Sequence, residues 1–210
     1  MPTLLRGKQL ADVEAFTFVS NDNKFDVEAF LTRPPGCTDT AKCPLIVNIH
    51  GGPHGQQGPA FNFKNQVYAA RGWATLMVNY RGSTGYGQAF TDAVFADQNG
   101  NEAQDVLYAL SAAMRRNPWI DRDRLGVEGT SYGGQLSAWL ITQTSVFKAA
   151  IPTAGDHQPD QLQLHDLLQP VRADGVGRVP APGEPDGHAA GALRHPPRRQ
   201  RAHADAADAR

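Results

Sequence analysis

The chain has 210 residues, a formal net charge of −1 and an isoelectric point near 6.6. This length suits one domain of ordinary size, and the balanced charge excludes the basic footprint that nucleic-acid or anionic-membrane binding requires. The sequence has no apolar run of about 18 residues, and its N-terminus lacks an export signal. We therefore predict a cytoplasmic protein with neither a nucleic-acid nor a membrane partner.

The two cysteines, Cys37 and Cys43, lie close together beside an expected strand. Two cysteines do not make a disulfide framework, and their spacing fits no metal signature without further Cys or His nearby. We expect free thiols in a reducing cytoplasm, and the sequence indicates neither a metal nor a cofactor.

The chain joins two compositions. Residues 1–155 contain every Phe, Tyr, Trp, Ile, Met and Lys, whereas residues 156–210 hold seven of the fifteen prolines, five of the seven histidines and ten alanines. Such a tail cannot bury enough apolar surface to offset the entropy of ordering it, so we expect disorder there. The predicted organisation is a lead-in over residues 1–13, a folded domain over 14–155 and a disordered tail over 156–210.

In chain order, the folded part alternates strands with helices. The expected strands span residues 15–19, 25–31, 44–49, 74–80, 125–128 and 148–152, the first two forming an antiparallel pair. The expected helices span residues 65–71, 101–117 and 132–142. This alternation predicts an α/β fold with a mostly parallel sheet and helices on both faces.

One motif carries a nucleophile, the stretch Gly129-Thr130-Ser131-Tyr132-Gly133-Gly134. It lies between a short buried strand and an apolar helix, as a nucleophile elbow does in an α/β-hydrolase. A strained strand-to-helix turn lifts the serine oxygen above the sheet, and the helix N-terminus stabilises developing negative charge. The pattern predicts Ser131 as the nucleophile of a serine hydrolase.

A second motif, His50-Gly51-Gly52-Pro53, directly follows the first buried strand. Glycines leave a backbone N–H unshielded, and α/β-hydrolases take one oxyanion donor from a loop at this place. His50 is not expected to be the base, because in this fold the base follows the nucleophile in the chain. We expect it to order the loop.

These stretches, with Tyr80-Arg81-Gly82-Ser83-Thr84-Gly85-Tyr86-Gly87 and residues 118–124, resemble the catalytic domain of the prolyl oligopeptidase family. The similarity covers about residues 14–155 and is greatest to the acylaminoacyl-peptidase and dipeptidyl-peptidase-like branch. It implies an α/β-hydrolase fold, attack by Ser131 on a peptide carbonyl, and an oxyanion hole from the N–H groups of Gly52 and Tyr132. It also implies peptide substrates. Members of the family usually carry a β-propeller ahead of this domain, but this chain begins almost at the first expected strand, so we expect none here.

The tail departs from this family, whose catalytic Asp and His follow the nucleophile after two further strands. No such strands are recognisable beyond residue 155, so the fold is expected to be incomplete at its C-terminal end, and neither triad partner is identifiable. Codons that encode residues 156–210 can be chosen and then translated in the frame that starts at the second nucleotide of each codon. One such choice gives a sequence that starts ITNLISFNYMTYYNQYVRMEWG and resembles the family's continuation. We therefore hypothesise that an inserted nucleotide near the codon of Asp156 put the tail out of frame.

The predicted function is a serine peptidase acting on short peptides through an acyl-enzyme on Ser131, impaired here by the absence of an identifiable base. Two alternatives remain at this stage. One is a carboxylesterase or lipase-like hydrolase, and the other is a non-catalytic fragment. The sequence does not predict an oligomeric state.

Overall fold

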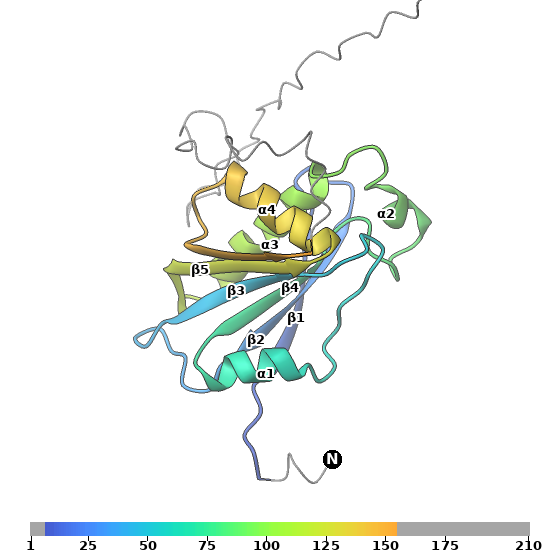
Figure 1. Ribbon diagram of the computed structural model, residues 1–210. Coiled ribbons are helices and arrows are strands. Elements are labelled where there is room, and N and C mark those ends of the chain that lie inside the picture. Colours follow the sequence, from blue (N-terminus) through green and yellow to red (C-terminus); the bar gives the residue numbers. More distant parts are fainter. Residues whose placement is uncertain (1–6, 155–210) are drawn as a thin grey trace, which may run out of the picture.

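A computed structural model describes residues 7–154 (Figure 1). The disorder predicted for residues 156–210 lies outside these residues. The described part contains six strands, which form one sheet in the order β1-β2-β4-β3-β5-β6. The strands are β1 (Asp12–Val19), β2 (Asp26–Arg33), β3 (Cys43–Ile49), β4 (Ala74–Asn79), β5 (Ile120–Thr130) and β6 (Ala149–Thr153).

The sheet is antiparallel at one side and parallel over the rest. β1 pairs with β2, and β2 with β4, in antiparallel register, whereas β3 pairs in parallel with both β4 and β5, and β5 with β6. Because β3 and β5 are neighbours, the segments that follow them emerge together at the carboxyl edge of the sheet. This edge is where an open α/β sheet binds its ligands.

Four helices connect or flank the strands: α1 (Phe63–Ala70), α2 (Gln88–Asp92), α3 (Asn101–Arg116) and α4 (Tyr132–Gln143). α1 lies on one face of the sheet, and α3 and α4 lie on the other (Figure 1). These positions follow from right-handed crossovers, because the chain moves in opposite directions along the sheet from β3 to β4 and from β4 to β5. The predicted α/β-hydrolase arrangement, with helices on both faces, is confirmed.

The core consists of the apolar strand runs and the inner faces of the helices. All six residues of β4 are buried, as expected of a strand covered on both faces. On α3 the buried apolar side chains include Val106, Leu110 and Met114, which share one face of the helix. Gly72 follows α1 with φ +77°, a left-handed conformation that suits a residue just beyond a helix end.

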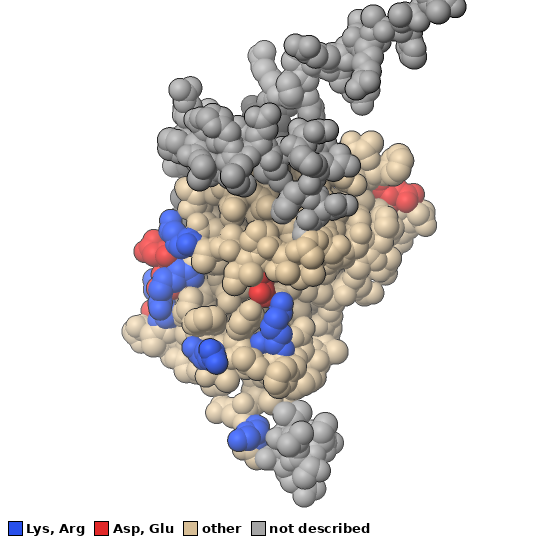
Figure 2. Space-filling view, viewed as in Figure 1, with Lys and Arg blue, Asp and Glu red and all other residues tan. Residues whose placement is uncertain are grey.

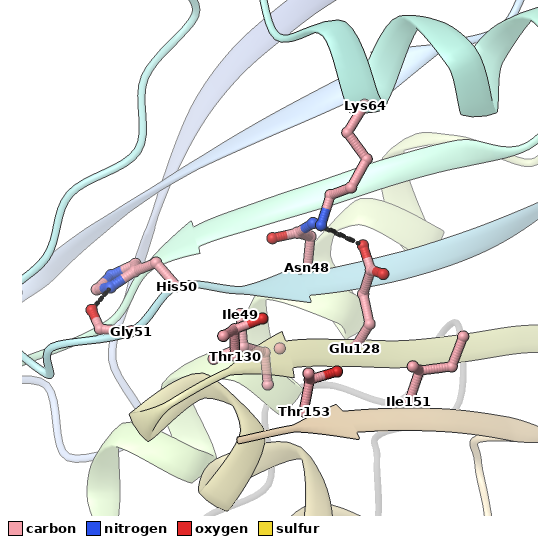
Figure 3. A pocket seen from close by; sticks show the side chains of 10 residues that line it. Asn48, Ile49, His50, Gly51, Lys64, Glu128, Thr130, Ile151 and Thr153 are labelled. Carbon is pink, nitrogen blue, oxygen red and sulfur yellow. Dashed lines mark hydrogen bonds and ion pairs between the residues drawn. The ribbon is translucent and has the colours of Figure 1, made fainter. Parts of the chain in front are cut away.

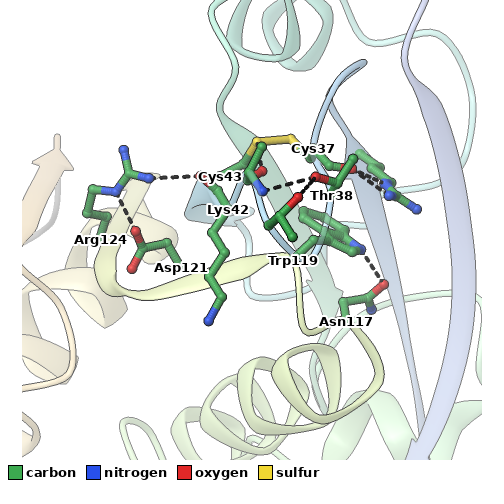
Figure 4. The surroundings of a disulfide bond; sticks show 11 residues. Cys37, Thr38, Lys42, Cys43, Asn117, Trp119, Asp121 and Arg124 are labelled. Carbon is green, nitrogen blue, oxygen red and sulfur yellow. Dashed lines mark hydrogen bonds and ion pairs between the residues drawn. A yellow bond between two sulfur atoms is a disulfide. The ribbon is translucent and has the colours of Figure 1, made fainter.

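The expectation of two free thiols was wrong, because Cys37 and Cys43 form a disulfide (Figure 4). The loop between β2 and β3 turns back on itself, with Thr38 and Ala41 exchanging two backbone hydrogen bonds of 3.1 Å. This turn brings the two Cα atoms to 5.7 Å, and Cys37 is buried. A spacing of six residues alone cannot reveal such a turn.

Reducing this disulfide is expected to lower the free energy of unfolding by about 2 kcal/mol, the chain-entropy value for so small a ring. Urea unfolding with and without dithiothreitol measures the loss. The Cys37→Ser/Cys43→Ser double variant is the control and should not respond to the reductant. Two thiols that react with iodoacetamide in the denatured, unreduced chain would contradict the bond.

Figure 2 shows the charged side chains on one face of the molecule. There, acidic and basic side chains are few and scattered, with no broad patch of a single sign. Within residues 7–154, no helix is long and apolar enough to cross a bilayer.

Candidate active site

Ser131 lies at the turn from β5 into α4, at the carboxyl edge of the sheet. Its backbone has φ 61° and ψ −124°, a region that non-glycine residues seldom occupy. This conformation costs about 1–3 kcal/mol, and it persists only where the surrounding structure fixes it. The Ser131 N–H donates to the Thr153 carbonyl of β6 at 2.9 Å, and the Ser131 carbonyl accepts from Gln135 at 3.0 Å.

Close backbone packing keeps this turn in place. A Cβ added to Gly129 would overlap the Gly133 carbonyl, and one added to Gly133 would overlap the Ile49 carbonyl at the end of β3. Gly129 and Gly133 are therefore required, because backbone lies where a side chain would be. The same packing sets β3 directly against the first turn of α4.

The segment after β3 runs beside Ser131. A Cβ built on Gly51 would stand 3.4 Å from Ser131 Cβ and 3.9 Å from Ser131 Oγ. Gly52 follows with φ +133°. Among residues 7–154, neither the Gly52 N–H nor the Tyr132 N–H has a hydrogen-bond acceptor. Two unengaged donors thus lie on the two segments that flank the serine.

His50 is held away from the serine by its own partners. Its Nδ1 lies 2.9 Å from the Gly51 carbonyl, its Nε2 lies 2.9 Å from Ser83 Oγ, and its ring stacks on Tyr80 at 4.3 Å. The only other histidine of the described part, His54, pairs through Nδ1 with the Gly82 carbonyl at 2.8 Å. Both histidines therefore order loops, and none of the residues described here lies within hydrogen-bond distance of Ser131 Oγ as a base.

Burial lowers the pKa of His50 from its ordinary value of 6.5, and the Gly51 carbonyl opposes this only in part. The unfolded chain therefore binds a proton at His50 in a pH range where the folded chain does not. Lowering the pH below about 6.5 is expected to destabilise the fold through this residue. Urea unfolding between pH 5 and pH 8 should show a weaker fall in stability for His50→Gln than for the wild type; parallel curves would contradict the assignment.

A polar pocket of about 180 Å³ lies next to the elbow, but Ser131 does not line it (Figure 3). Glu128 of β5 lines the pocket. Its carboxylate accepts hydrogen bonds from Asn48 Nδ2 at 2.6 Å and from Tyr68 OH at 2.9 Å. Lys64 Nζ of α1 lies 2.8 Å from the same carboxylate. The ion pair of Lys64 and Glu128 therefore lines this pocket. Among residues 7–154 no cluster of His, Cys, Asp and Glu could hold a metal.

A buried ion cluster supports the Gly-rich segment that follows β4. Arg81 binds Asp105 of α3 through Nε and Nη2 at 2.8 and 2.9 Å, and Asp22 of the β1–β2 turn through Nη1 at 2.8 Å. The hydrogen bonds from Arg81 hold the pKa of Asp22 well below its usual range. Burial raises the pKa of Asp105, with Arg81 opposing the rise. Arg81 thus joins the segment after β4 to α3 and to the β1–β2 turn.

Sequence reasoning placed Ser131, Gly52 and Tyr132 on adjoining segments but missed the groups behind them. Glu102 and Tyr80 are buried and bonded to these segments, and Glu128 is buried and accepts a hydrogen bond from Asn48 of β3. Of these three, only Glu102 could have been identified from the sequence, because an acidic residue in the first turn of a helix commonly caps its N-terminus.

A serine at a strained strand-to-helix turn, on a mostly parallel sheet with helices on both faces, defines an α/β-hydrolase. A profile described as the Prolyl oligopeptidase family matches residues 59–187, more than half of the chain. The chain belongs to this family.

Its relatives include an uncharacterized peptidase, YuxL, of Bacillus subtilis, 46% identical over 125 residues (60% of this chain, 19% of the relative). Another is dipeptidyl aminopeptidase BIII of Pseudoxanthomonas mexicana, 35% identical over 147 residues (67% and 21%). Among solved structures, Pyrococcus horikoshii acylaminoacyl peptidase matches with a TM-score of 0.67 and 32% identity, over 72% of this chain and 24% of that one. The chain spans about a fifth of the length of the curated relatives it matches.

Proposed function

We propose that the chain is the nucleophile-bearing portion of a serine peptidase that cleaves short peptides through an acyl-enzyme on Ser131. The Gly52 and Tyr132 N–H groups would bind the oxyanion, and no cofactor takes part. A His oriented by an Asp would accept the Ser131 proton and pass it to the leaving amine. Neither is identified in this chain, so the expected activity is very weak.

The observation that carries the proposal is the position of Ser131. Its left-handed backbone at the start of α4 lifts the side chain out of the sheet, and Gly51 packs beside it. The unengaged N–H groups of Gly52 and Tyr132 lie on the two flanking segments. The family assignment supports peptides as substrates.

A fluorophosphonate probe tests the proposal, because an oxyanion hole speeds phosphonylation of a serine even where the base that would activate it is missing. The full chain is expected to label slowly at one residue, and Ser131→Ala should abolish the labelling. Peptide mapping by mass spectrometry locates the adduct, and circular dichroism shows that both chains are folded. Equal labelling of Ser131→Ala would refute Ser131 as the nucleophile. Complete absence of labelling in the folded wild type would favour a non-catalytic fragment.

The esterase alternative has the same chemistry with a different acyl group. Parallel rates on an aminoacyl p-nitroanilide and a short p-nitrophenyl ester separate the two. The relatives' names favour peptide bonds, and we keep the peptidase as the conclusion.

The domain organisation is a further part of the proposal. We assign residues 14–155 to the peptidase domain, although β1 begins two residues earlier at Asp12. We assign residues 156–210 to out-of-frame sequence, although the family profile matches as far as residue 187. Four of the five residues of β6 are exposed, including Ile151 at 61%, which supports the view that the native continuation would cover this strand.

A cytoplasmic location is also proposed, and it requires the Cys37–Cys43 bond to be reduced in the cell, because cytosolic thiols are kept reduced. Alkylating the thiols in intact cells before lysis measures their state. Recovery of the chain with both cysteines unalkylated and disulfide-bonded would contradict the cytoplasm and indicate an oxidising compartment.

A further inference from the structure

A buried carboxylate contacts the residue that follows the nucleophile. Glu102, in the first turn of α3, is fully buried and accepts a hydrogen bond of 2.8 Å from the Tyr132 hydroxyl. It also accepts from the backbone N–H groups of Gly100, at 3.0 Å, and Asn99. Three donors satisfy a charge that would otherwise be costly to bury. The Tyr132 side chain is thereby fixed at its polar end.

An aromatic row continues from Tyr132 to the segment after β3. The rings of Tyr132 and Tyr80 stack with centroids 6.3 Å apart, and those of Tyr80 and His50 with centroids 4.3 Å apart and planes within 12°. The Tyr80 hydroxyl donates to the His50 carbonyl at 2.8 Å. All three rings are buried. The four residues from Glu102 to His50 form one connected unit, here called the aromatic row.

Both proposed oxyanion donors are attached to this row. One is the backbone N–H of Tyr132 itself, and the other belongs to Gly52, two residues after His50. A backbone N–H has no rotamer of its own, so its direction is set by whatever holds the neighbouring residues. Oxyanion stabilisation requires donors fixed in advance at hydrogen-bond distance from the developing charge.

We propose that Glu102 and Tyr80 are positioning residues, which set the separation and direction of the Tyr132 and Gly52 N–H groups. The proposal rests on the proposed function of these two donors. It assigns a role to the first turn of α3, which lies 30 residues before the elbow in sequence.

Two variants distinguish this role from ordinary helix capping. Tyr132→Phe removes only the hydroxyl, so Glu102 keeps its bonds to Asn99 and Gly100 and still caps α3. Tyr80→Phe removes only the hydroxyl, which donates to the His50 carbonyl and lies 3.3 Å from His50 Nδ1. The matched control is Leu110→Ala, which creates a cavity two turns further along α3 and outside the row.

Amide hydrogen exchange on the full chain provides a test that needs no activity. The experiment uses conditions under which every variant stays folded. Tyr132→Phe and Tyr80→Phe are expected to speed amide exchange in residues 50–55 and in residues 129–134 by about tenfold, because each variant loses the stabilisation of one strong hydrogen bond. Leu110→Ala should leave these segments unchanged relative to the rest of the chain. Unchanged exchange in segment 50–55 of Tyr132→Phe would overturn the proposal, as would an equal change in Leu110→Ala.

Fluorophosphonate labelling gives the functional counterpart. Both tyrosine variants are expected to label Ser131 about tenfold more slowly than Leu110→Ala. A labelling rate equal to that of the control would contradict a positioning role. If the wild type does not label at all, the proposed function fails for this chain, and the exchange experiment alone decides whether the row positions the two segments.

Discussion

Removing one nucleotide at the codon of Asp156, so that the sequence after it is read in the other frame, is expected to raise peptidase activity by about 10⁴-fold or more. The reason is that a serine without its base retains only the help of the oxyanion hole, and loss of triad members costs up to about 10⁶-fold in related chemistry. If the frame hypothesis holds, the restored frame supplies the aromatic-rich continuation of the family together with its Asp and His. Hydrolysis of an aminoacyl p-nitroanilide measures the gain.

The control for this experiment is Ser131→Ala in the restored frame, which should return the rate to that of the present chain. Resequencing the gene across the codons of Gly155 and Asp156 is the direct check. A clean reading that reproduces the present tail would refute the frame hypothesis, and so would a restored chain that folds without a gain in rate.

Replacing Arg81 with alanine is expected to lower the free energy of unfolding by about 3–5 kcal/mol, a large part of the stability of an ordinary domain. Arg81 and Asp105 are almost completely inaccessible to solvent, with side-chain exposures of 2% and 0%. Without the guanidinium, the Asp105 carboxylate would remain buried with no positive partner. Urea unfolding followed by tryptophan fluorescence measures the loss.

Arg124→Ala is the matched control, because Arg124 pairs with Asp121 at 2.7 Å with its side chain 56% exposed. An exposed pair contributes at most about 1 kcal/mol. Similar losses for the two variants would show that Arg81 is not the buried anchor described here.

Local patterns were sufficient to predict the strands, three of the helices and the elbow. The apolar runs at residues 44–49 and 74–80 could only be buried strands, and the glycines around Ser131 left one plausible turn. β5 was predicted too short, because its first half carries Asp121, Arg122 and Arg124 and resembles a loop. That half is held by pairing of Ile120 with Cys43 across a bulge, which no local pattern reveals. α2 has only five residues and no periodicity.

The burial and the partners of the groups behind the site could not be predicted from the sequence, for a different reason. Glu102 and Asp105 both lie in α3, where charged residues usually face solvent, yet both are fully buried. Their partners, Tyr132 and Arg81, are 30 and 24 residues away in the chain. Only the folded sheet brings them together, so a single sequence cannot show that these carboxylates have acceptor roles.

The strand order has a practical consequence for dividing the molecule. The chain leaves β4, passes over β3 through α3 and adds β5 on the far side, so β3 and β5 are adjacent although about 70 residues of sequence separate them. A cut in the segment between α2 and α3 would place the Gly52 loop on one fragment and Ser131 on the other. Neither fragment alone would hold a serine beside both backbone donors. Reassembly of the two pieces could then be followed by probe labelling, which would make this domain a split reporter of association between proteins fused to its halves.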